Sequence, residues 1–555
     1  MANEILKMKK RNIFLIIGIA ALASIAAADS YFEINKNIDI FSSMFKELNS
    51  NYVDGVDADK LTQTGIDAML DNLDPYTNLI TEEDLDNYKF QTTGRYGGIG
   101  AQVRDDGDYI TIAEPYEGFP AQRAGLQAGD AIISVDGISC KNKTVDEVSH
   151  LLKGTPNTGF KITVKRPGIN VDITKEIKRE EVVIKSVNYS GMIDKQIAYI
   201  KFTQFTDNSA RELSDAFKEL KEKNPELKGL ILDVRSNPGG LLNEAVDIAN
   251  LFIPRGSEVV STKGKQAEWD KKYVAMNNPV DVDLPIAVLT NHNSASAAEI
   301  VSGVLQDNDR AVVIGQRTYG KGLVQTTRPL PYGNKLKVTT AKYYIPSGRC
   351  IQALDYTHRN ADGSVGKVPD SLKHEFKTKN GRKVFDGGGI EPDVKMDEVE
   401  MSLLSQQLFV KGILFEFATQ YKINHPTIAA AKDFRLTDAD FDEFVKFAGT
   451  KNFEHQSESE KALSDLKKEA EKEKYFDDFK TQFENLQAKL NHDKKDDLYH
   501  NKTEIKELLE NEIVSRYYFQ KGRTEADFNN DPAILKSVAI LKDKASYESL
   551  LVVKK

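Results

Sequence analysis

The sequence predicts a multidomain protein in which an α/β core is flanked by a β-rich segment and by helical ends. Between about 180 and 394, apolar runs of strand length alternate with amphipathic helical segments, the pattern of an α/β layer structure. Short strand-like runs separated by glycines occupy 95–166, and beyond about 398 the chain becomes helical and heavily charged. At 555 residues the chain is too long for one hydrophobic core, so about two to four domains are expected.

The composition is that of a globular protein, with 40% hydrophobic and 29% charged residues. A net charge of −9 argues against a nucleic-acid-binding protein. The two cysteines, Cys140 and Cys350, are too few to indicate a redox compartment. The histidines show no spacing typical of metal ligands, so we expect neither a metal nor another cofactor.

Residues 1–28 have the pattern of a signal peptide or a membrane anchor. Basic residues between Lys7 and Arg11 precede an apolar run, 13–28, which ends in three alanines. The run is short for a membrane-spanning helix, but an uncleaved anchor with its basic end in the cytoplasm is the alternative. Both arrangements predict a protein of the cell envelope, either free in the periplasm or facing it from the membrane.

Residues 29–92 are predicted to form helices. Apolar side chains recur every three or four positions from Ile34 to Leu48 and again from Leu61 to Leu70, as on one face of an amphipathic helix. The region contains the sequence Leu-Asp-Pro-Tyr-Thr at 73–77.

Residues 93–180 contain a glycine-rich loop made of Gly97, Gly98, Ile99 and Gly100. Such a loop can turn successive backbone N–H groups toward the carboxylate at the end of a peptide chain. A helix predicted over 145–152 would form the other wall of an apolar groove. Several matched segments, taken in order, resemble a PDZ domain; a tight hairpin without a ligand is the alternative interpretation.

A candidate nucleophile lies between two predicted strands of the core. An apolar strand at 285–290 is followed by a polar turn, a helix from about Ser294 and a second strand at 311–314. Ser296 therefore lies at the start of a helix, where unpaired N–H groups and the positive end of the helix dipole favour negative charge. Its attack on a carbonyl would create such a charge, although a second N-capping residue is the simpler interpretation of Ser296.

A serine needs a base, and the nearby sequence offers His292 and Lys321. A lysine acts as a base only when burial lowers its pKa toward neutrality. Gly320 and Gly322 permit close packing around Lys321, whereas His292 lies in a polar turn and is expected to face solvent. From spacing alone, Lys321 could equally be a lysine of a surface loop.

The sequence from Gly315 to Lys321 also matches most of a phosphate-binding loop. The position that would bind magnesium through a hydroxyl is Gly322, however, and the following segment, 323–330, is predicted to be a strand. The strand would form a hairpin with 335–344. The sequence therefore argues against nucleotide binding.

Two motifs, Ser-Ala-Ser-Ala-Ala-Glu at 294–299 and Gly-Lys-Gly-Leu-Val-Gln at 320–325, resemble those of the carboxy-terminal processing peptidases, or tail-specific proteases. The resemblance extends over about 73–394. It implies that Ser296 is the nucleophile, Lys321 the base, and Gln325 the residue that orients the lysine, since residues four apart on a strand share a face. It also implies a ClpP/crotonase-like spiral core and dimers formed through amino-terminal helices, although packing within one molecule explains an amphipathic helix there equally well.

A second turn of the core bears on the same chemistry. The strand at 229–234 is followed by Asn-Pro-Gly-Gly, in which Gly239 and Gly240 can leave backbone N–H groups free for a ligand. The resemblance implies that one of these glycines and Ala297 stabilise an oxyanion. The sequence does not decide between Gly239 and Gly240.

The remaining predictions concern organisation and function. We divide the chain into five regions: 1–28, signal peptide or anchor; 29–92, amino-terminal helices; 93–180, PDZ domain; 181–398, serine peptidase core; and 399–555, a charged all-α region. That last region is either a solvated appendage or a surface for a partner, including a second copy.

The resemblance implies an ATP-independent serine endopeptidase that cleaves exported proteins near accessible carboxyl-terminal tails. Membrane association through the amino terminus would follow if 1–28 is retained. The alternatives are a catalytically silent PDZ-containing scaffold and, less strongly, an acyl-handling enzyme of the crotonase type.

Overall fold

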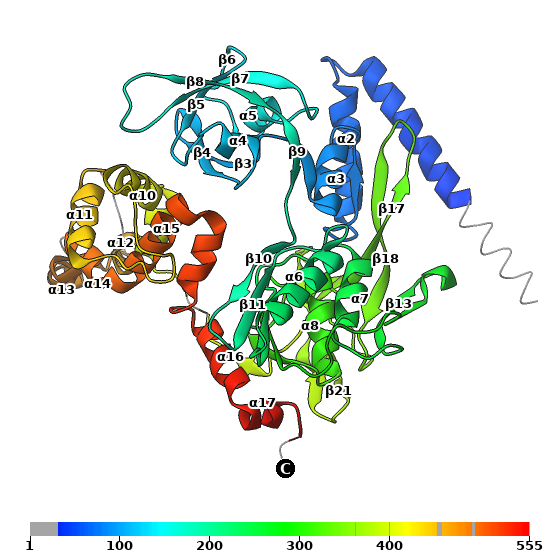
Figure 1. Cartoon of the computed structure of the whole chain (residues 1–555). Coiled ribbons are helices and arrows are strands. Elements are labelled where there is room, and N and C mark those ends of the chain that lie inside the picture. Colours follow the sequence, from blue (N-terminus) through cyan, green and yellow to red (C-terminus); the bar gives the residue numbers. More distant parts are fainter. Residues whose placement is uncertain (1–31, 361, 399, 452–457, 491–493, 554–555) are drawn as a thin grey trace, which may run out of the picture.

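A computed structural model describes residues 32–360, 362–398, 400–451, 458–490 and 494–553 (Figure 1). The predicted signal peptide or anchor, 1–28, lies outside these residues. Within them, no helix combines the length and the apolar character needed to cross a bilayer.

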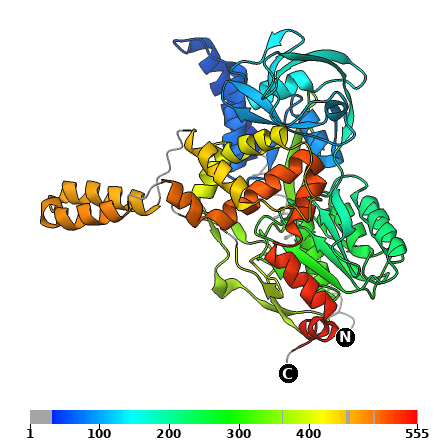
Figure 2. The ribbon, with the colours of Figure 1, turned by 60° about the vertical axis from the view of Figure 1, so that its left-hand side comes forward.

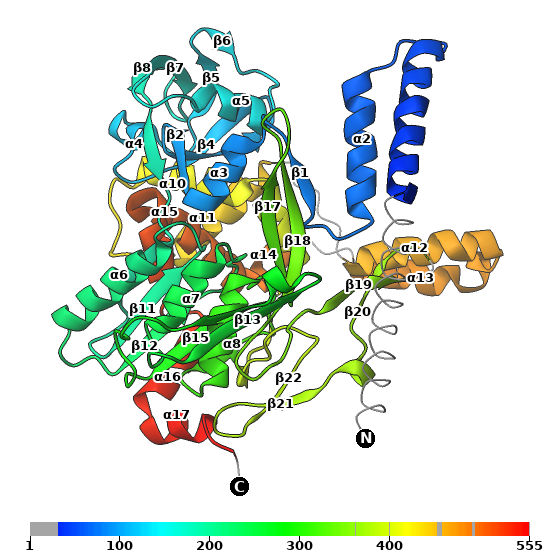
Figure 3. The ribbon, with the colours of Figure 1, turned by 90° about the vertical axis from the view of Figure 1, so that its right-hand side faces the viewer.

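The amino-terminal region is a pair of helices that stands beside the body of the molecule (Figure 3). The first helix spans 32–51 and the second is α2 (Ala58–Asp71), whose first turn is capped by the Asp57 carboxylate. Many apolar side chains on this pair are exposed, among them Phe32, Ile38 and Phe41. The short strand β1 (Asn78–Ile80) and α3 (Leu85–Thr93) follow, and β1 pairs with β18 (Lys335–Tyr344) of the core.

A small β domain comes next in the chain. Its antiparallel sheet has the order β3-β4-β5-β7-β8, with β6 beside β5. The strands are β3 (Ala101–Asp106), β4 (Tyr109–Pro115), β5 (Ala131–Val135), β6 (Ile138–Ser139), β7 (Gly159–Lys165) and β8 (Ile173–Lys178). The helix α5 (Val145–Leu152) has the predicted bounds and packs against β3. A two-stranded ribbon of β2 (Arg95–Gly98) and β9 (Glu180–Val183) joins this domain to the core.

The core contains a six-stranded sheet of order β10-β11-β12-β15-β16-β23, parallel except for β10. Its strands are β10 (Val187–Met192), β11 (Ile197–Phe202), β12 (Gly229–Asp233), β15 (Ile286–Thr290), β16 (Val312–Gly315) and β23 (Val394–Lys395). Every residue of β12 and β15 is buried, as expected for parallel strands covered on both faces.

Each face of this sheet packs against a different part of the chain. Ile200, Leu232 and Val288 pack with the helices α6 (Ser209–Lys223), α7 (Leu242–Asn250) and α8 (Ala297–Asp307). The alternate residues, such as Ile231 and Leu289, pack instead with α16 (Pro532–Lys542) and α17 (Lys544–Leu550), which end the chain. One face of the core sheet is therefore covered by α16 and α17, which come after the bundle helices in the sequence.

A second sheet, of order β1-β18-β13-β14 with β17 paired to β18, lies over α8. Its further strands are β13 (Glu258–Gly264), β14 (Lys271–Val274) and β17 (Leu323–Pro329). The predicted hairpin of β17 and β18 is confirmed, and its turn contains Tyr332 and Gly333, both with positive φ. β17 is the strand predicted to follow the phosphate-loop-like sequence, 315–321, so that prediction is confirmed.

The carboxy-terminal helices form their own hydrophobic core from α9 (Leu403–Val410), α10 (Ile413–Asn424), α11 (Asp438–Gly449) and α15 (Lys502–Asp527). The hairpin of α12 (Glu458–Glu473) and α13 (Phe476–Leu490) projects away from this bundle (Figure 2). α15 is kinked at Phe519, which has φ 54°.

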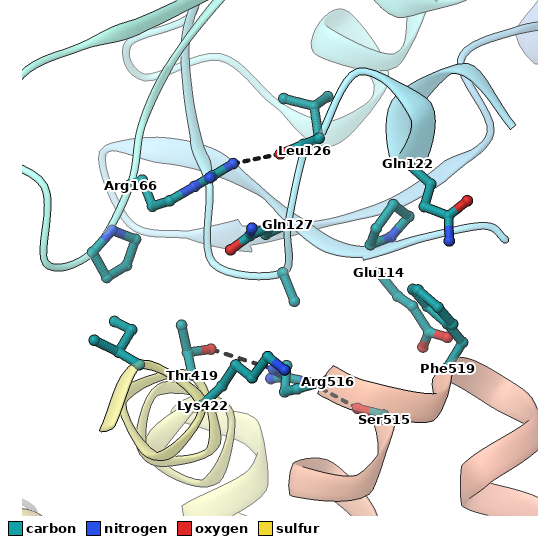
Figure 4. A pocket seen from close by; sticks show the side chains of 15 residues that line it. Glu114, Gln122, Leu126, Gln127, Arg166, Thr419, Lys422, Ser515, Arg516 and Phe519 are labelled. Atoms are coloured by element: carbon teal, nitrogen blue, oxygen red, sulfur yellow. Dashed lines mark hydrogen bonds between the residues drawn. The ribbon is translucent and has the colours of Figure 1, made fainter. Parts of the chain in front are cut away.

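The bundle contacts the small β domain around a cavity of about 260 Å³ (Figure 4). Arg166 of the β domain and Lys422, Arg516 and Phe519 of the bundle are among its lining residues. Beside the cavity Arg523 of α15 forms an ion pair with Glu114, with 3.3 Å between Nη1 and Oε2.

Candidate active site

Ser296 lies at a sharp turn between β15 and α8. Its backbone has φ 55° and ψ −114°, a strained conformation typical of a residue whose side chain a strand-to-helix turn holds outward. Its neighbours Ala295 and Ala297 are buried, while Ser296 itself is partly accessible. The helix begins at Ala297, later than the predicted start near Ser294, and the Ser294 hydroxyl donates to the carbonyl oxygen of Val234, which follows β12.

Lys321 lies in a loop that the flanking glycines allow to pack closely. A Cβ atom on Gly320 would come within 2.3 Å of Ala353 Cβ, and one on Gly322 within 2.8 Å of the Gln352 nitrogen. Burial is the main cause that lowers the pKa of the Lys321 amine to about 8, and the nearby positive charge of Lys337 lowers it further. A neutral amine is therefore available near neutral pH.

Glu299 joins the backbones of the two candidate residues. Its Oε2 atom accepts from the N–H of Ser296 at 2.8 Å and from the N–H of Lys321 at 2.9 Å. Oε1 accepts from the Thr318 hydroxyl at 2.5 Å and from the Gly320 N–H at 2.7 Å. Complete burial raises the pKa of Glu299 to about 7 against the opposing effect of these hydrogen bonds.

A tyrosine of β18 makes a second connection. The Tyr343 hydroxyl lies 3.1 Å from the carbonyl oxygen of Ser296 and 2.6 Å from that of Lys321. Its side chain is almost completely buried. The structure thus brings Ser296 and Lys321 into one hydrogen-bonded unit of their main chains.

The Lys321 side chain itself rests on an aromatic ring. Its Nζ atom lies 4.1 Å from the ring centre of Tyr76. Within the described residues no hydrogen bond joins this amine to the Ser296 hydroxyl. The main chains of the pair are therefore joined, while their side chains form no hydrogen bond with each other in this conformation.

Among the positions that the structure describes, no hydrogen bond joins Gln325 to Lys321. The Gln325 Nε2 atom donates to the Thr339 hydroxyl at 3.2 Å. β17 begins only at Leu323, so Lys321 lies outside the strand and the strand alternation used to predict the contact does not apply to it.

The turn with Gly239 and Gly240 packs against Ser296. A Cβ atom on Gly239 would lie 2.8 Å from both Ser296 Cβ and the Ala297 nitrogen, so only glycine fits there. The N–H of Gly239 already donates to Asn237 Oδ1 at 2.9 Å. In the described part of the chain, the N–H groups of Gly240 and Ala297 have no hydrogen-bond acceptor, which leaves both available to a ligand.

His292 is exposed, as expected. Its Nδ1 atom lies 3.2 Å from Gln316 Oε1 and 3.4 Å from the Glu398 carboxylate, in a surface network. Among the residues with defined positions, no cluster of three or more His, Cys, Asp or Glu side chains is arranged to hold a metal ion.

Of the four residues predicted to form the carboxylate-binding loop, Gly97 and Gly98 instead end strand β2, where they pair with β9, and Ile99 and Gly100 connect β2 with β3. The carbonyl oxygen of Ile99 accepts from the N–H of Ala121 at 2.8 Å, which fixes the loop. Gly100 has φ 71°, and a Cβ atom there would lie 2.4 Å from Phe119 Cβ; one on Gly97 would lie 2.0 Å from the Gly154 oxygen. These glycines are therefore required by the packing of the loop. A Cβ atom on Gly98 would likewise lie too close to a neighbour, at 2.7 Å from Cε2 of the Tyr96 ring.

Sequence reasoning missed Glu299, Tyr343 and Tyr76. Glu299 carries a local signal, since a Glu three positions after a helix-capping Ser is the spacing of a capping box. Tyr343 and Tyr76 have no such local sequence signal, because their contacts depend on the pairing of strands that are distant in the sequence.

Comparison with known proteins gives three matched regions. The chain matches peptidase family S41 over 196–359, a PDZ domain over 111–166, and the carboxy-terminal helical domain of probable PDZ-proteases over 404–541. It is 34% identical over 358 residues to a carboxy-terminal-processing protease of Bartonella bacilliformis, covering 63% of this chain and 82% of that protein.

A probable CtpA-like serine protease of Staphylococcus aureus (strain MSSA476) is 37% identical over 425 residues, or 74% of this chain and 83% of that one. Among solved structures, a photosystem II D1 C-terminal processing protease shares 27% identity over 66% of this chain and 94% of its own, with a TM-score of 0.34. The matched regions include both the strand–turn–helix around Ser296 and the loop of Lys321. The chain therefore belongs to the carboxy-terminal-processing proteases of peptidase family S41, which are serine-type peptidases with a PDZ domain.

Proposed function

We propose that Ser296 and Lys321 form the catalytic dyad of this peptidase. The neutral amine of Lys321 takes the proton of Ser296 as the hydroxyl attacks the scissile carbonyl, and then gives it to the leaving amine. The acyl group on Ser296 is afterwards released by water. The observation that carries this assignment is the shared attachment of both main chains to Glu299, because it fixes the two residues relative to each other.

The oxyanion would be stabilised by the N–H groups of Ala297 and Gly240. Both lack an acceptor within the described structure, whereas the N–H of Gly239 is occupied by Asn237. Each such donor typically contributes about 3 kcal/mol to the stability of the transition state. Gly239 would then contribute through its lack of a side chain, which lets the turn pack closely against Ser296.

Gln325 would hold the lysine amine once the amine has turned toward Ser296. Its Nε2 atom is fixed by Thr339, and its Oε1 atom has no donor within the described part of the chain. A carbonyl oxygen in that position can accept a hydrogen bond from Lys321 and orient the nitrogen lone pair.

The PDZ domain would bind the tail of the substrate. The loop of Gly97, Gly98, Ile99 and Gly100 would receive the terminal carboxylate, and α5 and β3 would enclose the preceding side chains. This arrangement would select polypeptides with an accessible carboxyl end and deliver them to Ser296 without ATP.

The proposed localisation and homodimer are argued from sequence patterns and from the exposed apolar side chains of the amino-terminal helices. The basic and apolar pattern of 1–28 supports export to the periplasm, with membrane attachment if the segment is retained. The exposed apolar face of the helix at 32–51 supports a homodimer formed through the amino-terminal helices. The α/β core would have the ClpP/crotonase-like spiral, and the domains would have the boundaries 29–92, 93–180, 181–398 and 399–555.

The test uses the purified protein and an unstructured polypeptide with a free carboxyl end. Wild-type protein is expected to cleave it, while the Ser296→Ala and Lys321→Ala variants are not. Cleavage that survives either substitution would exclude the dyad. A wild-type protein that binds the polypeptide but leaves it intact would instead indicate a scaffold.

A further inference from the structure

Among the described residues, the amine of Lys321 has a cation–π contact with a ring that comes from the amino-terminal side of the chain. The Tyr76 ring lies 4.1 Å from Nζ, in the position of a cation–π contact. Across the residues that the structure describes, this amine forms no ion pair and no hydrogen bond. Tyr76 belongs to the segment 73–77, which follows the helical pair and precedes β1.

Hydrogen bonds hold this segment firmly against the core. Oδ1 of the buried Asp74 accepts from the N–H groups of Tyr76 and Thr77, both at 2.9 Å. The Thr77 hydroxyl in turn accepts from the N–H of Thr339 on β18 at 3.1 Å. The position of the Tyr76 backbone is therefore fixed by the same strand that contacts Gln325.

The ring of Tyr76 is held as well. Its hydroxyl donates to the Tyr319 hydroxyl at 3.3 Å, and Tyr356 meets it edge-on with 6.2 Å between ring centres. Tyr319 lies two positions before Lys321 in the loop, and Tyr356 comes from β19 (Leu354–Arg359). Two tyrosines from separate parts of the chain thus hold the ring on which the lysine amine lies.

We propose that Tyr76 is a positioning residue that holds the Lys321 side chain in a resting place as an ammonium ion, from which the neutral amine leaves to reach Ser296. The proposal rests on the dyad assigned above. The face of an aromatic ring attracts a cation and has little attraction for a neutral amine. Tyr76 therefore stabilises the protonated form, which cannot accept the proton of Ser296, and the amino-terminal segment sets how much active base is present.

Other charged groups act on the same amine. Lys337 of β18 opposes its positive charge, whereas Asp74 and Glu299 favour it. Burial raises the pKa of Tyr76 and of Tyr356, so both phenols stay neutral over the working range. Lys337, Asp74 and Glu299 all remain when only the side chain of Tyr76 is changed, so their charges are the same in each variant.

The experiment measures the rate of Ser296 phosphonylation against pH in the full-length protein, with an uncharged alkyl fluorophosphonate that loses fluoride and needs no tail-binding site. Tyr76→Leu keeps an apolar side chain over the lysine but removes the ring. We expect the ascending limb of its pH profile to move to lower pH, with phosphonylation below the midpoint faster by about two- to tenfold. Tyr76→Phe keeps the ring and loses only the hydroxyl, so its midpoint should match that of the wild type.

A midpoint for Tyr76→Leu that equals that of Tyr76→Phe, or lies above it, overturns the proposal and assigns Tyr76 a role in burial alone. If Tyr76→Leu does not fold, replacement of Tyr76 by a trifluorinated phenylalanine keeps the shape and weakens the ring's attraction for cations. Its midpoint should also fall, and an unchanged value contradicts the proposal. If the dyad assignment is wrong, the result differs: the ascending limb of the wild-type pH profile would then be unchanged in Lys321→Met.

Discussion

The backbone N–H groups of Ser296 and Lys321 donate to a single atom, Oε2 of Glu299. Glu299 lies in the first turn of α8 and is completely buried. Its other oxygen fixes Thr318 and Gly320, which lead into the lysine loop. One carboxylate thus sets the distance between the start of the helix and the loop.

Glu299→Gln is therefore expected to reduce kcat by about a hundredfold, because a small displacement of the reacting groups is costly. An amide nitrogen would face N–H donors in place of one carboxylate oxygen, leaving buried groups unpaired and lowering the free energy of unfolding by about 1–3 kcal/mol. Steady-state kinetics and denaturant unfolding measure the two effects. Glu222→Gln, at an exposed position of α6, should change neither, and an unaffected kcat in Glu299→Gln would contradict the argument.

The pH dependence of activity should show the titration of Lys321. Since burial lowers the pKa of its amine to about 8, the neutral base accumulates as pH rises, and kcat/KM should climb through a midpoint near that value. An ascending limb near about 10 would show a solvent-exposed lysine instead.

Substitution of Lys337 should shift the midpoint of the kcat/KM pH profile in a known direction. Its positive charge opposes protonation of Lys321, so Lys337→Met should raise the pKa of the Lys321 amine and move the limb upward by about half a pH unit. At neutral pH the variant should consequently be slower. Lys335→Met removes a charge from the same strand, where Lys335 contacts Tyr88 instead, and should leave the midpoint in place. A downward shift in Lys337→Met would show that the charges do not interact in this way.

The sequence predicts the local parts of this site and not the contacts that join them. The strand at 286–290 and the helix after Ser296 follow from hydrophobic patterns within a few residues. The hydroxyl of Tyr343 lies 47 positions from Ser296, and its contact depends on the pairing of β18. Gln325 shows a limit of simple alternation, because Lys321 lies before β17 begins and strand periodicity therefore does not fix where the lysine side chain lies relative to Gln325.

The PDZ loop should make recognition depend on the free carboxylate of the substrate. A peptide whose carboxyl end is converted to an amide should bind with a KM raised about tenfold or more, because a charge-assisted hydrogen-bond network is lost. kcat should change little, since the tail lies away from the reacting bond. In Gly100→Ala the added methyl group would meet Phe119, and the acid and amide forms should become equivalent. Equal KM values for both peptides with the wild type would exclude carboxylate recognition by this loop.

The helices α16 and α17 should be essential to the stability of the core, although they follow the helical bundle of α9, α10, α11 and α15 in the chain. Ile534 of α16 is completely buried against the second face of the sheet, beside Ile231 and Leu289, whereas the adjacent Leu535 is 46% exposed. Ile534→Ala should lower the free energy of unfolding by about 2–5 kcal/mol, the range for large-to-small substitutions in a core. Leu535→Ala, the same kind of change one position along, should cost less than about 0.5 kcal/mol. Equal effects of the two substitutions in denaturant unfolding would mean that α16 does not cover the sheet in solution.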